Sequence, residues 1–231
     1  MVNDEDRAVE RTEFWHQLTE EERADLRVSG ALRRWSRREI LFHEGGASDQ
    51  VLIVLTGRCK VSSHTAGGTE AVLAVRGPGT LVGELGVIDG SPRSATVQAL
   101  DDLTALALTP DRFEAYLRRW PRVSLLLLRM VTSRLRDADR KRVEFGALDA
   151  GRRVASRLVE LAEKFGRTEE GDDVRLDLPV SQDELASWTG VSRAAVNKAL
   201  SLLRARGWIS TGRMSITLHD VAALRGYAED A

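Results

Sequence analysis

LVGELGVIDGSPRSATVQA, at residues 81–99, is the stretch that decides the fold. Both of its ends have the composition of β-strands, and a short polar crossover lies between them. Gly83 lets the backbone approach a ligand closely, and Glu84 adds a carboxylate that can bind sugar hydroxyls. Arg93 presents a planar set of donors that suits a phosphate, and Ser94 adds a hydroxyl. Together these groups indicate a nucleotide site. A second interpretation is that Glu84 and Arg93 only pair with each other and bind no ligand.

The composition is that of a globular protein without a membrane span. The 231 residues suffice for one large domain or two modest ones, and 42% are hydrophobic and 30% charged. The longest apolar run covers only residues 125–128, and the N-terminus is too polar for a signal peptide. A single cysteine, Cys59, excludes an internal disulfide and fits the cytoplasm. The net charge of −1 excludes a globally basic protein but allows a local basic patch.

The sequence predicts a helix at the start of the chain and a series of short strands after it. Residues 4–28 are predicted to form a helix, within which Thr19 and Glu22 form a capping signal. Residues 32–108 contain many short apolar runs separated by glycine turns. That pattern is typical of a closed antiparallel β-roll or jelly roll.

A long helix follows the predicted roll. Thr109 and Pro110 start a first helix, Pro121 interrupts it, and a second helix continues to about residue 148. A heptad spacing predicts a two-helix coiled coil and hence a homodimer. The seam consists of Leu128, Val131, Leu135, Ala138, Arg142 and Phe145. The alternative is an amphipathic helix that lies on the β-roll of its own chain.

Gly151 is expected to end this helix, and a new helix is expected to begin at Arg152. The predicted organisation is therefore an α+β chain of three parts. They are a β-roll at 1–122, a dimerisation helix at 123–148 and a winged helix-turn-helix at 149–231.

The last part has the signature of a helix-turn-helix. Ser181 and Glu184 form a capping box for a first helix, Gly190 lies in the turn, and Ser192 caps a second helix. Alternating residues at 207–218 predict a two-stranded wing. Five cations against two acids at 181–213 favour DNA, with the second helix in the major groove. The expected DNA-binding residues are Ser181, Ser192, Arg193, Ala194, Asn197, Lys198 and Arg213.

These motifs, in this order, resemble those of the Crp–Fnr family of bacterial transcription regulators. The Gly-Glu and Arg-Ser-Ala pairs at 83–84 and 93–95 resemble the phosphate-binding cassette of the cyclic-nucleotide-binding domain. The resemblance implies a dimer that binds a pseudo-palindromic double-stranded DNA operator in the cytoplasm and contacts RNA polymerase. It also implies that cyclic AMP or cyclic GMP is held by Gly83, Glu84, Leu85, Arg93 and Ser94.

Two positions depart from the family pattern. Cyclic-AMP-responsive members present a Thr followed by Ser or Asn to the adenine, where this chain has Ala138 and Asp139. The recognition helix has Ala194 where the family usually has a Glu that accepts from cytosine. The DNA target should therefore be related to that of the family but not identical. A regulator that works without a cyclic nucleotide, or with another effector, stays an open alternative.

Other sensor chemistries and catalysis find little support in the sequence. An iron–sulfur cluster needs about four cysteines, and only Cys59 is present. The four histidines are scattered, so we expect no metal site and no haem, and Cys59 is expected to be a buried apolar residue. The chain has no nucleophile–base pair and no phosphate-binding loop of the Walker type, so we expect no enzyme.

Overall fold

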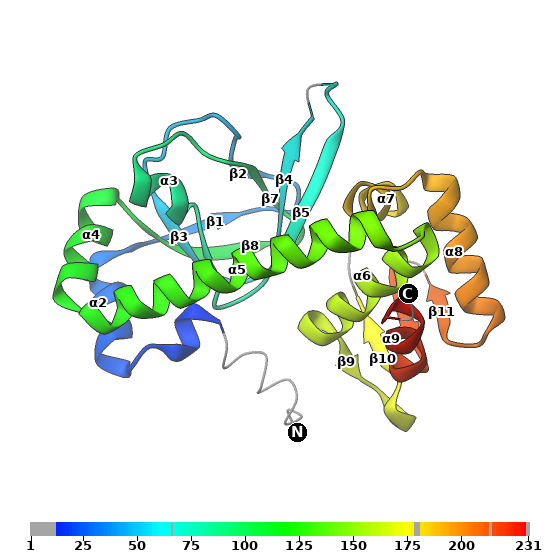
Figure 1. Cartoon of the computed structure of the whole chain (residues 1–231). Coiled ribbons are helices and arrows are strands. Elements are labelled where there is room, and N and C mark those ends of the chain that lie inside the picture. The colour runs from blue at the N-terminus through cyan, green and yellow to red at the C-terminus, as the bar shows by residue number, and fades with distance from the viewer. Residues whose placement is uncertain (1–12, 66, 178–180, 213, 230–231) are drawn as a thin grey trace. The chain divides into compact units, whose positions relative to one another are not determined.

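The structure is a computed structural model that describes residues 13–65, 67–177, 181–212 and 214–229 (Figure 1). The described residues pack as two compact units, one ending at Leu135 and the other beginning at Arg136. The division lies inside a long helix rather than at 148/149, where the sequence places the start of the last domain. The roles assigned to the three predicted parts stay predictions. The predicted α+β class is confirmed, because helices accompany three antiparallel sheets.

Two four-stranded sheets form the β-roll of the N-terminal unit. Their strand orders are β1-β8-β3-β6 and β2-β7-β4-β5. The strands are β1 Ala31–Trp35, β2 Ile40–Phe42, β3 Val51–Thr56, β4 Cys59–His64, β5 Glu70–Arg76, β6 Leu81–Val82, β7 Thr96–Ala99 and β8 Leu103–Leu108. Leu52 and Val54 of one sheet share a buried core with Cys59 and Val97 of the other. The two sheets therefore pack face to face.

Strand β3 is buried on both of its faces, which explains its continuous apolar sequence. Val51 and Ile53 point away from the core between the sheets and pack with Leu26, Phe113 and Leu127 of the helices. The helices of this unit are η1 Phe14–Gln17, α2 Glu20–Ser29, α3 Glu84–Asp89, α4 Pro110–Arg119 and α5 Pro121–Ala147, the last of which crosses into the C-terminal unit.

The prediction of one helix over 4–28 is wrong for its described part. Leu18 and Thr19 have extended backbone and separate η1 from α2. The capping signal that the sequence predicts is the physical reason: Thr19 Oγ1 accepts a bond of 3.3 Å from the Glu22 amide, and Glu22 Oε2 accepts one of 2.7 Å from the Thr19 amide. A residue that caps a helix cannot also continue one.

The C-terminal unit surrounds one further sheet, of order β11-β12-β10-β9. Its elements after α5 are α6 Ala150–Phe165, β9 Arg167–Thr168, η2 Glu170–Asp172, β10 Val174–Leu176, α7 Gln182–Thr189, α8 Arg193–Ala205, β11 Ile209–Gly212, β12 Ser215–Leu218 and α9 Val221–Glu229. The predicted wing corresponds to the antiparallel pair β11 and β12.

The predicted role of Gly151 is wrong. Helix α6 already begins at Ala150, because Asp149 caps it by accepting a bond of 3.0 Å from the Arg152 amide. Gly151 therefore lies in the first turn of α6. A Cβ there would stand 2.6 Å from Tyr227 Oη, so close packing against α9 favours glycine at this position.

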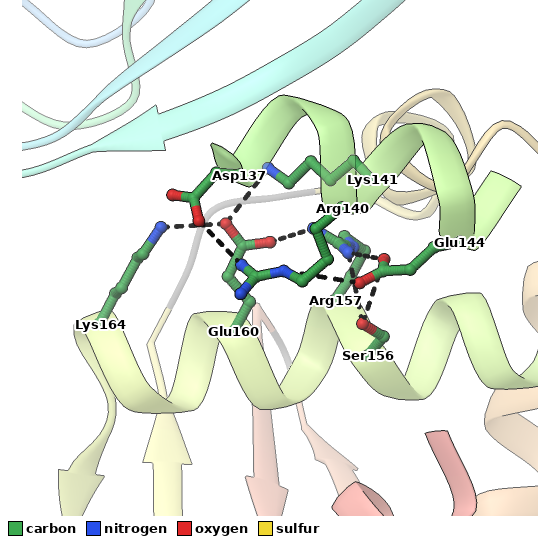
Figure 2. Close-up of polar contacts among 8 residues, drawn as sticks. All are labelled: Asp137, Arg140, Lys141, Glu144, Ser156, Arg157, Glu160 and Lys164. Carbon is green, nitrogen blue, oxygen red and sulfur yellow. Dashed lines mark hydrogen bonds and ion pairs between the residues drawn. The ribbon is translucent and has the colours of Figure 1, made fainter. Parts of the chain in front are cut away.

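A network of ion pairs fastens the end of α5 to α6 (Figure 2). Arg157, whose side chain is 5% exposed, donates to both Glu144 and Glu160. Glu160 also accepts from Lys141 at 3.3 Å and from Lys164 at 3.0 Å. Burial by itself raises the pKa of Glu160, but the charges of Lys164, Lys141 and Arg157 outweigh it and lower this pKa from 4.5 to about 2. The stabilisation is therefore present above pH 4.5 and is lost as the pH falls towards 2.

We predict that Arg157→Ala lowers the stability of the C-terminal unit by about 3–5 kcal/mol, because it leaves two carboxylates largely buried without their shared partner. The measurement is the opening free energy from hydrogen exchange of the α6 amides. Arg175→Ala is the control, since that arginine is exposed and paired with Asp177, and it should cost about 1 kcal/mol or less. Equal losses in the two variants would contradict a structural role for the network.

Candidate functional site

The stretch at 81–99 forms a strand, a short helix, an extended segment and a strand. Its ends lie in β6 and β7, as predicted, while the crossover contains the helix α3. Gly83 precedes α3 with φ +81°, and Gly90 follows it with φ +71°. Both values lie in the left-handed region, which glycine adopts most readily.

Arg93 is buried and held by the backbone around it. Its Nη1 donates to the Gly83 carbonyl at 2.8 Å, and its Nη2 donates to the Gln50 carbonyl at 2.7 Å and to Asp49 Oδ1 at 3.2 Å. The guanidinium carbon lies 3.7 Å from the centre of the Phe42 ring. Burial lowers the pKa of Arg93, and the charge of Asp49 partly opposes this shift. The guanidinium is therefore fixed in place before any ligand arrives.

One donor of Arg93 is left over. Its Nε is buried and has no hydrogen-bond partner among the residues that the structure describes. A buried donor without an acceptor is costly, so this nitrogen is able to donate to a further acceptor.

Glu84 is also buried, at 2% exposed, and its partner comes from the long helix α5. Arg134 Nη1 donates to Glu84 Oε1 at 2.5 Å, and Arg134 Nη2 donates to the Leu81 carbonyl at 2.8 Å and to Thr80 Oγ1 at 3.3 Å. The carboxylate therefore pairs with Arg134 rather than with Arg93.

Sequence reasoning missed Arg134, although one signal for it exists. Arg134 lies seven residues after Leu127 and eleven after Val123, both buried, so it continues the covered face of α5. A charged residue on an apolar face needs a partner inside the fold.

The remaining predicted nucleotide residues are open to solvent. Leu85 is the second residue of α3 and is exposed, and Ser94 is exposed beside the buried Arg93. The structure thus brings Gly83, Glu84 and Arg93 together in the interior, while Leu85 and Ser94 lie at its surface.

The helix-turn-helix has the predicted caps. Ser181 Oγ accepts from the Glu184 amide at 3.1 Å, and Glu184 Oε2 accepts from the Ser181 amide at 2.8 Å. Ser192 Oγ accepts from the Ala195 amide at 3.2 Å. Gly190 turns the chain with φ +63°, and a Cβ there would lie 2.5 Å from the ring of Phe145. The turn therefore needs glycine for its backbone and for its packing against the end of α5.

One exposed face of α8 carries the predicted DNA residues. The buried side of the helix consists of Val196, Ala199, Leu200 and Leu203, as predicted. The exposed residues are Ser181 before α7 and Ser192, Arg193, Ala194, Asn197 and Lys198 at the start of α8. Among the described residues Arg193 pairs only with the exposed Asp183, at 3.3 Å, and so stays available. Arg213 lies outside the described residues.

Other sites of the kinds that the sequence raised are not found in the described ranges. Cys59 is fully buried, and burial raises the pKa of its thiol to about 12, so the thiol stays neutral. Among the described residues, no three His, Cys, Asp or Glu side chains gather as a metal site. None of the helices in the described part of the chain combines the length and the apolar character needed to cross a bilayer.

Two family models match the two regions described above. Residues 32–119 match the cyclic nucleotide-binding domain, and residues 152–227 match the Crp-like helix-turn-helix domain.

Similar proteins extend this match over most of the chain. The CRP-like cAMP-activated global transcriptional regulator of Mycobacterium tuberculosis is 32% identical over 184 residues, or 80% of this chain and 82% of that protein. The Cyclic AMP receptor protein of Thermus thermophilus is 30% identical over 217 residues, which are 93% of this chain and 96% of that protein. The solved structure of FixK2 from Bradyrhizobium japonicum has the same fold, with a TM-score of 0.77 and 22% identity. The match covers 87% of this chain and 98% of FixK2.

We predict that Gly83→Ala destabilises the N-terminal unit more than Gly90→Ala does. Both substitutions force alanine into positive φ, which costs roughly 1–2 kcal/mol. Only at Gly83 would the new Cβ meet other atoms, 2.6 Å from Arg93 Nη1 and 2.7 Å from Phe42, whereas nothing lies within 4 Å at Gly90. Overpacking should add about 1–3 kcal/mol in urea denaturation. Equal losses would show that Gly83 is needed only for its backbone conformation.

Proposed function

The chain belongs to the Crp–Fnr family of transcription regulators, and on that premise we propose that it is a homodimer that binds a pseudo-palindromic DNA operator under the control of a cyclic nucleotide. The domains and relatives named above are those of transcription regulators and not of enzymes. A DNA-binding regulator of this kind works in the cytoplasm beside RNA polymerase, which we propose as a further partner.

The exposed face of α8 is the observation that carries the DNA-binding role. Arg193 and Lys198 are exposed at the start of a helix whose other face is packed, which is how a recognition helix enters the major groove. Arg193 can bind guanine O6 and N7 with two donors, and Lys198 can bind guanine or phosphate. Ser181 and Ser192 lie where hydroxyls reach phosphate oxygens.

The cyclic nucleotide is supported by the buried charges of the cassette. Arg93 is fixed and keeps one donor, Nε, without a partner, and Glu84 is a buried carboxylate that can accept from ribose hydroxyls. Two relatives are named as activated by cAMP or as a receptor for it. We therefore propose that the phosphate binds at Arg93 and the ribose at Glu84.

The second candidate is a DNA-binding regulator that works without a cyclic nucleotide. Glu84 is already satisfied by Arg134, and two donors of Arg93 are taken by carbonyl groups. The positions that read adenine in cyclic-AMP-responsive relatives hold Ala138 and Asp139, neither of which has a hydroxyl. These contacts favour either a regulator that binds DNA without any effector or one that responds to an effector other than a cyclic nucleotide.

Exposed apolar residues on α5 support the homodimer. Leu128 and Leu135 are 61% and 60% exposed and stand seven residues apart on one face of the helix. Val131 of the predicted seam is half-buried because it packs against the core of its own chain. We propose that a second copy covers Leu128 and Leu135.

We predict that Leu135→Asp converts a dimer into a monomer, because a charge buried at the seam costs several kcal/mol. Sedimentation at micromolar concentration measures this. Val28→Asp is the control, since Val28 is 85% exposed on α2 and should leave the dimer intact. A wild type that sediments as a monomer would contradict the proposed seam.

We predict that selection from random DNA returns a palindrome with half-sites roughly 10 base pairs apart, centre to centre. Arg193→Ala should cost about 1–3 kcal/mol of operator binding and relax the base preference at one position. Arg225→Ala is the control, because Arg225 is an exposed, paired arginine on α9. Ala194→Glu should sharpen the preference at a neighbouring position. A selection that returns no palindrome, or a base preference that Arg193→Ala leaves unchanged, would contradict the proposal that α8 binds in the major groove of DNA.

A further inference from the structure

We propose that the C-terminal unit binds a small carboxylate ion in a pocket between the end of α5 and the helices α6 and α7. Lys141 and Phe145 of α5, Arg153 of α6 and Trp188 of α7 are among the residues that line this pocket. All of them belong to one compact unit, whereas the residues proposed for the cyclic nucleotide belong to the other. The inference therefore adds a second ligand to the proposed function and does not depend on the first.

Two buried donors belong to residues in the wall of this pocket. The indole nitrogen of Trp188 and Nε of Arg153 are buried, and neither has a hydrogen-bond partner among the described residues. Trp188 as a whole is only 3% exposed. The described part of the C-terminal unit holds no other buried side-chain donor or acceptor of this kind. Because buried polar groups are nearly always paired, both nitrogens are able to donate to an acceptor that enters the pocket.

Arg153 also gives the pocket a positive charge. No ion pair joins Arg153 to another described residue, and its guanidinium carbon lies 5.5 Å from the centre of the Phe145 ring. Arg157 and Lys141 line the pocket too, but they pair with Glu144 and with a second carboxylate, on α6 (Figure 2). The charges of these neighbours are thus balanced inside the network, and that of Arg153 is not. A ligand with a single negative charge suits such a wall.

The size and the chemistry of the wall favour a short carboxylate. The pocket measures about 210 Å³ with the part that is open to solvent, below the roughly 300–1,000 Å³ of pockets for larger ligands. A carboxylate has two acceptor oxygens, one for each of the two donors. The rings of Phe145 and Trp188 supply apolar wall for a short alkyl group. An ion of the size of acetate combines these properties.

NMR spectroscopy of the full-length, ¹⁵N-labelled chain tests the proposal. When acetate replaces chloride at constant ionic strength, the indole resonance of Trp188 should shift and saturate, with a Kd on the order of 1 mM. Acetamide has nearly the same shape without the charge, and it should bind at least about 10-fold more weakly. The indole resonance of Trp208 should not move, because Trp208 lies in the same unit but does not line the pocket.

Two neighbouring arginines of α6 provide matched variants. Arg153→Gln removes the unbalanced charge and should weaken acetate binding about 10- to 100-fold. Arg152→Gln is the control, because Arg152 pairs with Asp149 and does not line the pocket. It should change the affinity less than about threefold. Acetate should accordingly raise the unfolding temperature of the wild type and of Arg152→Gln, but not that of Arg153→Gln.

Trp188→Phe tests the second donor independently. It keeps an aromatic ring in the wall and removes the indole N–H, so it should weaken acetate binding about 3- to 10-fold. The backbone amide of Thr189, which also lines the pocket, reports binding in this variant. Because Trp188→Phe retains Arg153, it decides the case in which Arg153→Gln does not fold.

Three results would overturn the inference. They are an indole resonance of Trp188 that acetate does not shift saturably, equal affinities for acetate and acetamide, and an affinity for acetate that neither Arg153→Gln nor Trp188→Phe lowers. None of them concerns the N-terminal unit. Calorimetry with cyclic AMP on the same variants keeps the proposed function separate, because neither substitution should change cyclic nucleotide binding.

Discussion

The buried ion pair between Glu84 and Arg134 is the interaction on which the proposed effector site depends. It joins the segment 81–99 to α5 within the N-terminal unit, with a donor–acceptor distance of 2.5 Å. A carboxylate so deeply buried needs a partner, and the long helix supplies it. An effector that uses Glu84 must therefore share the carboxylate with Arg134 or displace it. We infer that an effector bound at this site changes the contacts of α5 through the side chain of Arg134.

The end of α5 is tied just as firmly to the DNA-binding unit. Glu144 and Lys141 of α5 share the network with Arg157 and Glu160 of α6, and Phe145 packs on the glycine of the helix-turn-helix. Because these contacts involve buried charges and a position without room for a Cβ, the last turns of α5 move with this unit or lose several interactions at once. The helix α5 thus contacts the residues proposed for the effector through Arg134, near its middle, and the turn before α8 through Phe145, near its end.

Local signals in the sequence predicted the parts of the fold that depend on neighbours in the chain. The capping boxes at Thr19 and Ser181, the turn at Gly190 and the packed face of α8 all follow from residues within four positions of one another. The same locality explains two errors. The cap at Thr19 interrupts a helix pattern that had been extended across it, and the cap at Asp149 starts α6 at Ala150, before the glycine that was expected to separate the two helices.

Contacts between distant residues could not be predicted in the same way. Arg134 and Glu84 lie 50 positions apart, and Arg76 and Cys59 meet only once β5 pairs with β4. Glycine and arginine at 83 and 93 predict a nucleotide site by their spacing, but nothing in that spacing says which cation neutralises Glu84. The most direct test of the account is the operator affinity of the dimer, measured by fluorescence anisotropy with and without saturating nucleotide. Effector control through α5 predicts a change of about 5- to 150-fold. Identical affinities in the presence and absence of a nucleotide that binds at Arg93 would contradict it.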